Sequence, residues 1–291
     1  MSEAPIEGNG IEASPTAALE IRRLSPHIGA EIGGVDLRED LDAGTIAAIR
    51  AALLEHKVIF FRDQPLSRAQ HLRFARRFGE LEIHPATPAD QPDPEVLRIA
   101  HGPDSRGREN SWHSDVTWRA EPSLGSVLRA IEVPETGGDT LFSCMYAAYE
   151  ALSPEMKKWV CTLSAEHDIA QVFAKRLGRS AEELREQYPV QVHPVVRTHP
   201  ETGRRGLYVN TAFTRSIQGL SEKESSWLLE HLYSFAARPE HQCRFSWRPD
   251  SIAFWDNRAC QHYAASDYFP AVRVMERVTI AGDRPYFDPD R

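Results

Sequence analysis

The chain has 291 residues, of which 41% are hydrophobic and 26% charged, as is typical of a globular protein with a substantial core. Its formal net charge of −8 argues against a nucleic-acid-binding protein, because such proteins usually carry a basic patch. No apolar run approaches the ~18 residues that a membrane-spanning helix needs. The four cysteines are scattered without a CxxC pair, so we expect a cytoplasmic protein that binds neither nucleic acid nor membranes.

The first third of the chain is predicted to be rich in helix. Residues 1–18 lack the features of a secretory signal, and we expect a flexible acidic tail there, followed by a single domain at 19–291. Apolar periodicity then predicts a strand, a helix, a strand and a helix at residues 29–37, 41–57, 58–61 and 67–79. Ser67 and Gln70 form a capping-box pattern at the start of the second helix.

Short strands dominate the middle and the end of the chain. The middle is predicted to contain a strand at 126–133, a turn at 134–140, a helix at 153–163 and strands at 190–197 and 206–210. A helix at 221–235, capped by Ser221 and Glu224, and strands at 251–257 and 273–282 follow. Because the strands do not alternate regularly with helices, a parallel doubly wound sheet is disfavoured. We predict a mostly β fold in which helices flank a largely antiparallel core.

The segment ENSWHSDVTW at 109–118 holds a histidine and an aspartate two residues apart, His113 and Asp115. In extended backbone, side chains at i and i+2 point the same way, so both could reach one metal ion if this stretch is a strand or its end. His262, beyond the strand predicted at 251–257, is the natural third ligand. Two histidines and one carboxylate with open positions are typical of non-haem Fe(II) oxygenases, and zinc can use the same trio.

The alternative for the HxD triplet is a structural histidine near a surface aspartate, since the chain has twelve histidines. Two arginines on the last predicted strand favour a site instead. Arg273 and Arg277 are four residues apart and therefore project from the same face. On a solvated face they would need no partner, but on a face turned to the core each guanidinium would need an anion. One site would then hold a redox metal and two anions.

Four segments carry the specific part of the pattern: WHSDVT, GGDTLF, HPVVRTHPETG and WDNRACQHYAASDYFPAVRVMERVTIAGDRPYF. They resemble the Fe(II)/2-oxoglutarate-dependent taurine dioxygenase family, which also contains alkylsulfate and aryloxyalkanoate dioxygenases. The likeness extends from about Ile28 to Phe287. It implies a double-stranded β-helix (jelly-roll, cupin-like) core. It also implies Fe(II) held by His113, Asp115 and His262, with 2-oxoglutarate and O2 as co-substrates.

The resemblance also assigns residues to the co-substrate and the substrate. Arg273 and Thr140 would bind the far carboxylate of 2-oxoglutarate. The substrate would meet Arg277 at its anionic end, and its remaining contacts would be His84, the backbone N–H of Val116, and the walls Phe173 and Phe213. Trp112 and Trp255 flank the ligand segments, and we expect them to pack against and stiffen the metal ligands.

The chain departs from the taurine enzymes towards the end of the site that receives the amine of taurine. Thr87 stands where those enzymes have a tyrosine, and Glu109, followed by Asn110, stands where they have an asparagine. A glutamate there could pair with an ammonium group or could repel a second anion. The anionic end of the substrate is therefore better supported than the amine end.

The function implied is hydroxylation of the carbon next to the sulfonate of taurine or a related alkanesulfonate, releasing sulfite, an aldehyde, succinate and CO2. The alternative keeps the iron chemistry and acts on an alkyl sulfate ester or an aryloxyalkanoate. The family further implies a homo-oligomer, either a dimer or a tetramer. Other classes are a non-enzymatic anion-binding β-barrel and a zinc hydrolase, whose general base would have to be Glu109, on the far side of the ligand segment.

Overall fold

The computed structural model describes residues 19–85, 87 and 90–291, so the tail predicted at 1–18 lies outside the described residues. Within this part of the chain, eight strands form the largest sheet, in the order β1-β2-β3-β14-β6-β16-β4 with β5 also paired to β16. Their bounds are β1 Glu20–Arg23, β2 Ala30–Gly33, β3 Val58–Phe61, β4 Leu81–Glu82, β5 Val96–His101, β6 Gly125–Glu132, β14 Ile252–Asp256 and β16 Arg273–Ile280.

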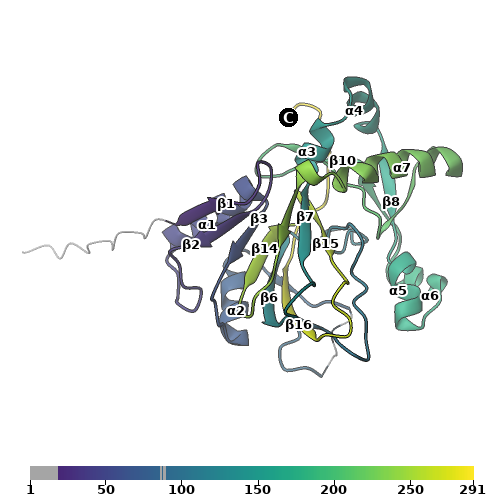
Figure 1. The fold of residues 1–291 in the computed structure, drawn as a ribbon. Coiled ribbons are helices and arrows are strands. Elements are labelled where there is room, and N and C mark those ends of the chain that lie inside the picture. Colours follow the sequence, from purple (N-terminus) through teal and green to yellow (C-terminus); the bar gives the residue numbers. More distant parts are fainter. Residues whose placement is uncertain (1–18, 86, 88–89) are drawn as a thin grey trace, which may run out of the picture.

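Three smaller sheets complete the strands. They contain β7 Thr140–Cys144, β13 Gln242–Phe245 and β15 Cys260–Ala264; β8 Ser164–His167, β9 Gln191–Pro194 and β12 Thr214–Ile217; and β10 Val196–Thr198 with β11 Arg205–Leu207. The helices are α1 Ala43–His56, α2 Arg68–Arg76, α3 Met145–Glu150, α4 Pro154–Val160, α5 Ala170–Leu177, α6 Ala181–Gln187, α7 Glu222–Ala236 and the 3-10 helix η1 Pro239–His241. Figure 1 shows α1 and α2 on one side of the strands and α5 and α6 at the opposite edge.

Alternate residues of the central strands face two different cores. On β3, Ile59 and Phe61 pack in a cluster with residues of α1 and α2. Val58 and Phe60 pack instead with residues of β7, β13 and β15, and the rings of Phe60 and Phe245 stack 3.9 Å apart. Because both faces of the sheet are covered, the run VIFF is buried throughout and is continuously apolar. Burial of each such side chain contributes roughly 1.5–3 kcal/mol.

The predicted helices are present, and each begins after a side chain that caps its first turn. The helix predicted at 41–57 is α1, which begins after Asp42, whose side chain accepts the Thr45 N–H, and ends at the left-handed Lys57 with φ 64°. The helices predicted at 67–79 and 221–235 are α2 and α7, and both have a complete capping box. The helix predicted at 153–163 is α4, which ends sooner, at Val160.

The prediction of a largely antiparallel sheet is confirmed, since β2 with β3 is the one parallel pairing within the described residues. The strand predicted at 206–210 is wrong beyond Leu207, where the chain leaves the ladder. The reason is Asn210, whose side-chain oxygen accepts the N–H groups of Ala212 and Phe213 and so holds a turn. The fold is mixed α/β with several sheets, and its helices α3, α5 and α6 were not predicted.

Among the residues that the structure describes, no helix combines the length and the apolar character needed to cross a membrane.

Candidate metal centre

His113 and Asp115 lie between β5 and β6, where His113 forms an isolated antiparallel bridge with His262 and Asp115 begins a turn, so the stretch is the end of a β-bridge and not a regular strand. The His113 N–H donates to the carbonyl of His262 at 3.1 Å, and the His262 N–H donates back at 2.8 Å. This bridge fixes His113 against β15. Val116 follows with φ 47°, an uncommon conformation for a β-branched residue. The segment therefore bends sharply at Asp115. The side chains of His113 and Asp115 meet across this bend and not along an extended strand.

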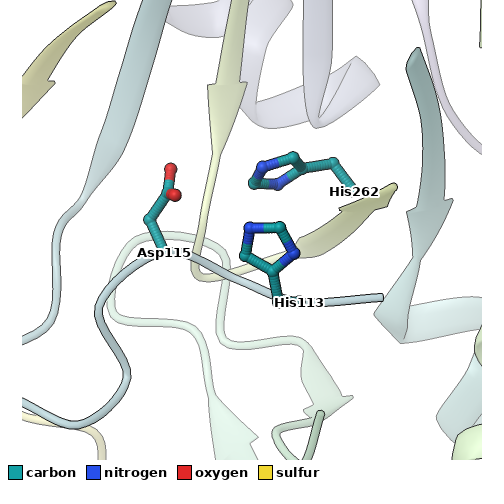
Figure 2. A group of neighbouring side chains, drawn as sticks. All are labelled: His113, Asp115 and His262. Carbon is teal, nitrogen blue, oxygen red and sulfur yellow. The ribbon is translucent and has the colours of Figure 1, made fainter. Parts of the chain in front are cut away.

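The three predicted ligands meet in space. Ligand atoms of His113, Asp115 and His262 all lie within 4.8 Å of one another, and Figure 2 shows the three side chains directed into one common space. Asp115 and His262 are buried, and His113 is half-buried. No other cluster of three such side chains within 19–85, 87 and 90–291 could hold a metal ion.

Hydrogen bonds and an ion pair fix the carboxylate of Asp115. The Ser126 hydroxyl donates to Oδ2 at 2.9 Å, and the Arg277 guanidinium donates to Oδ1 at 2.6 Å. The Asp115 N–H donates to Oδ1 of Asn257 at 3.1 Å, and the same oxygen accepts the Trp255 indole N–H at 2.9 Å. Burial alone would raise the pKa of Asp115, but Arg277 and the two imidazoles hold it below the ordinary value. The side chain is thus ionised, as a metal ligand must be.

The two imidazoles present lone pairs to the same space. His113 Nδ1 lies 2.8 Å from the carbonyl oxygen of Ser111, so Nδ1 carries the hydrogen and Nε2 keeps its lone pair. Nδ1 of His262 is buried and has no hydrogen-bond partner within the described part of the chain. Burial, followed by the neighbouring His113, lowers the pKa of His262 to about 3, which keeps its ring neutral. These donors fit a divalent metal such as Fe(II).

The two tryptophans next to the ligand segments differ in their contacts. The ring of Trp255 packs 4.9 Å from that of His262, as the packing prediction required. The ring of Trp112 packs 5.6 Å from that of Tyr263, so its contact with the ligands runs through the neighbour of His262.

A cavity lined by the imidazoles of His113 and His262 is also lined by Arg273 and Thr140. The Thr140 hydroxyl accepts the Trp247 indole N–H at 3.0 Å, and Arg273 Nε donates to the carbonyl of Gly138 at 3.1 Å. One terminal nitrogen of Arg273 is buried without a hydrogen-bond partner among the described residues, and burial lowers the pKa of this guanidinium. A buried, incompletely bonded cation beside a metal site suits the carboxylate of a chelating co-substrate.

A second cavity adjoins the first and collects every predicted substrate contact. It is lined by Arg277, His84, Val116, Phe173 and Phe213. The Phe213 ring lies 6.1 Å from the His113 ring, and the Phe173 ring lies 6.1 Å from that of His84. Burial, with Arg277 as the next cause, lowers the pKa of His84 to about 3. The structure thus brings together residues from five separate stretches of the sequence.

The three residues at which the chain departs from the taurine enzymes differ in their relation to the two cavities. Thr87 and Asn110 do not line either cavity, whereas Glu109 lines both. The placement of Glu109 on the far side of the ligand segment is therefore wrong. Its carboxylate is paired with His101 and Arg176, which hold its pKa at about 2 against the opposing effect of burial.

Four residues of the site were not predicted: Ser126, Asn257, His101 and Arg176. Asn257 had a usable signal, because it ends the strand predicted at 251–257, just ahead of the third ligand. Arg176 lies on α5, a helix that was not predicted, and its partner is 67 positions away in the chain. Ser126 and His101 carry no local motif that marks their contacts.

Comparisons with known proteins cover nearly the whole chain. The family model for taurine catabolism dioxygenase TauD, TfdA family, matches residues 20–279. An alkylsulfatase of Acinetobacter baylyi is 38% identical, with 93% of this chain and 87% of the relative covered. An alpha-ketoglutarate-dependent sulfate ester dioxygenase of Pseudomonas putida is also 38% identical, with 92% and 91% covered. The crystal structure of a taurine dioxygenase from Burkholderia xenovorans has a TM-score of 0.82 at 40% identity, with 95% and 92% covered.

Proposed function

The chain belongs to the TauD/TfdA family of Fe(II)- and 2-oxoglutarate-dependent dioxygenases, and we propose that it oxidises a small organosulfur anion. The substrate is an alkanesulfonate or an alkyl sulfate ester, hydroxylated at the carbon next to the charged headgroup. Taurine, which the sequence resemblance implied, is one member of this class. The names of the relatives support the class, since they include an alkylsulfatase, a sulfate ester dioxygenase and a taurine dioxygenase.

The position of two arginines on one strand, Arg273 buried and Arg277 half-buried, carries this proposal. Arg273 and Arg277 reach from β16 into two adjoining cavities, both of which include His113 in their lining. Each guanidinium has one buried nitrogen without a hydrogen-bond partner among the described residues, Nη2 in Arg273 and Nε in Arg277. Arg273 has no anionic partner among the described residues, and Arg277 is paired only with Asp115, a carboxylate that a bound metal would also engage, so each guanidinium can accept a further anion. Two anions with metal ligands between them fit a keto acid on one side and an anionic substrate on the other.

The residues of the chain divide the work by position. His113, Asp115 and His262 would hold Fe(II), while Arg273 and Thr140 would receive the far carboxylate of 2-oxoglutarate. Iron and 2-oxoglutarate together supply, in the presence of O2, an oxidant able to replace a C–H bond by C–OH. The facing sheets around the site would be the two halves of a double-stranded β-helix, which we propose as the core on family likeness.

Arg277 would fix the headgroup, so that the adjacent carbon, and no other, faces the metal ligands. Phe173 and Phe213 would exclude water from the same cavity. For a sulfonate, RCH2SO3⁻, O2 and 2-oxoglutarate give RCH(OH)SO3⁻, succinate and CO2, one oxygen atom entering each of the first two products. Loss of the C–S bond electron pair to sulfur then gives RCHO and HSO3⁻. For a sulfate ester, the hydroxylated product RCH(OH)OSO3⁻ loses the C–O bond electron pair to the ester oxygen and gives RCHO and HSO4⁻.

The test of this function is an anaerobic titration followed by product analysis. Fe(II) and 2-oxoglutarate should produce a weak visible charge-transfer band, and sulfonates and sulfate esters should perturb it. After admission of O2, succinate should appear in equal amount to sulfite or sulfate. If no organosulfur anion perturbs the band or releases sulfite or sulfate, the proposed substrate class is wrong.

One observation favours a second candidate, a carboxylate such as an aryloxyalkanoate. A guanidinium accepts a carboxylate as readily as a sulfonate, and Phe173 and Phe213 offer aromatic walls to an aryl group. The same panel separates the candidates, because a carboxylate substrate would give succinate without sulfite or sulfate. A homo-oligomer also stays a proposal, to be tested by light scattering.

A further inference from the structure

Glu109 lies where the two cavities of the site adjoin, and both of its carboxylate oxygens are already engaged. Oε1 accepts a hydrogen bond from Arg176 at 3.1 Å. Oε2 lies 3.1 Å from Nε2 of His101 and accepts the N–H of Arg108 at 3.0 Å. A carboxylate can only accept, so Nε2 of His101 carries the hydrogen of that contact. These partners come from β5, from α5 and from the residue beside Glu109 itself.

The charges that line the larger cavity are unbalanced towards cations. Four arginines line it, namely Arg98, Arg108, Arg176 and Arg277, against two carboxylates, Asp115 and Glu109. Asp115 is paired with Arg277 at 2.6 Å, and Glu109 is paired as described above. The cavity therefore presents no carboxylate oxygen without a cationic or N–H partner to an incoming ligand.

Apolar side chains of α5 also line the larger cavity. Val172, Phe173 and Leu177 line the cavity together with Arg176. Residues 173, 176 and 177 share one face of the helix, because they are separated by three or four positions. The ion pair of Arg176 with Glu109 thus joins the apolar face of α5 to the segment that carries the metal ligands.

We propose that Glu109, held by Arg176 and His101, makes this site select anions with an apolar tail against anions that also carry an ammonium group. The inference rests on the proposed function, whose headgroup contact it keeps. An ammonium that enters the cavity gives up its water and finds both lining carboxylates already paired with arginines. A methyl group in the same place gains apolar contact with α5. Glu109 and Arg176 are specificity-determining residues of the site.

Two ligands of nearly equal size isolate the effect of the tail. Taurine and 1-propanesulfonate share a sulfonate and differ in an ammonium against a methyl group. Dissociation constants come from the perturbation of the visible band of the anaerobic Fe(II)–2-oxoglutarate complex, without turnover. We expect 1-propanesulfonate to bind at least tenfold more tightly. Equal or tighter binding of taurine would overturn the inference and leave the proposed function standing. Binding of neither sulfonate would overturn the inference, and it would overturn the proposed function as well only if sulfate esters also failed to perturb the band.

Two substitutions should move the ratio of these constants in opposite directions. Arg176→Met frees Oε1 of Glu109 for an ammonium and should shift the ratio about tenfold towards taurine. Glu109→Gln leaves Arg176 without its anion and should shift the ratio further towards 1-propanesulfonate. Arg179→Met is the matched control: Arg179 bonds Gln187 and the Glu183 carbonyl and does not line the cavity, so the ratio should stay within twofold. An intact visible band shows that each variant is folded. A shift of the first two variants in the same direction, or of the control as far, would refute the assignment.

Discussion

Replacement of Arg273 by methionine should separate the effect of this buried cation on 2-oxoglutarate binding from its effect on the stability of the ligand-free protein. The guanidinium lies at the inner end of the cavity that also contains Thr140 and His262, and its side chain is almost fully enclosed. A co-substrate carboxylate there would accept about two charge-assisted hydrogen bonds, each worth roughly 1.5–3 kcal/mol. Their loss, at the lower limit of about 3 kcal/mol, weakens 2-oxoglutarate binding more than 100-fold.

The same substitution should not weaken the ligand-free protein. Arg273 loses the hydrogen bond to Gly138, which contributes about 1 kcal/mol, but the variant no longer buries a charge without its anion. Replacing buried ions by apolar side chains of similar volume is often neutral, or stabilising by roughly 1–4 kcal/mol. We therefore expect the urea midpoint of the metal-free, co-substrate-free variant to equal or exceed that of the parent.

Both effects can be measured on one pair of variants. Anaerobic titration of the Fe(II)-loaded protein gives the dissociation constant of 2-oxoglutarate, and Arg277→Met serves as the matched control. That variant should lose sulfonate affinity and, at equal iron loading, keep 2-oxoglutarate affinity within about threefold. The iron content is measured in both variants because Arg277 also bonds Asp115. The reasoning is refuted if Arg273→Met changes 2-oxoglutarate affinity less than tenfold, or if both variants weaken the two ligands equally.

Three further predictions concern other parts of the site and the core. Asp115→Ala should abolish turnover and reduce Fe(II) retention on gel filtration at least tenfold, and normal iron content would contradict the ligand role. Ser126→Ala removes the 2.9 Å hydrogen bond to Asp115 and should lower Fe(II) affinity 10–100-fold by the usual cost of losing such a contact, while unfolding in urea shifts little. Burial lowers the pKa of His71 to about 4, so the unfolded chain binds the extra proton first as pH falls below ~6.5. This group should therefore cost about 2 kcal/mol of stability between pH 7 and pH 5, and urea unfolding of His71→Gln should lack that part of the loss; parallel pH profiles would contradict it.

Local patterns in the sequence predicted the parts of the fold that depend on neighbouring residues. The capping boxes of Ser67 and Ser221 were visible because a cap is decided within four positions. The alternation along β16 correctly put Arg273 and Arg277 on one side. These inferences need only the period of a helix or a strand.

Contacts that join distant segments could not be predicted in the same way. His113 and Asp115 were expected to converge through extended backbone, but the segment bends at Asp115 and bridges to His262, 149 positions later (262 − 113). The partners of Glu109 were missed for the same reason, since Arg176 comes from a helix whose apolar pattern is short. Tertiary packing decides such contacts, and a single sequence carries no local trace of it.

Alternate residues of strand β16 face the cavity and the hydrophobic core. Arg273, Met275 and Arg277 border the cavity, whereas Val278 and Ile280 join the cluster beneath α1 and α2. Inserting or deleting one residue ahead of this strand would exchange the two sets and push guanidiniums into hydrocarbon. Substitutions at positions 273, 275 and 277 can therefore change the ligand preference of the site. An insertion or deletion ahead of β16 cannot, because it would disrupt the core.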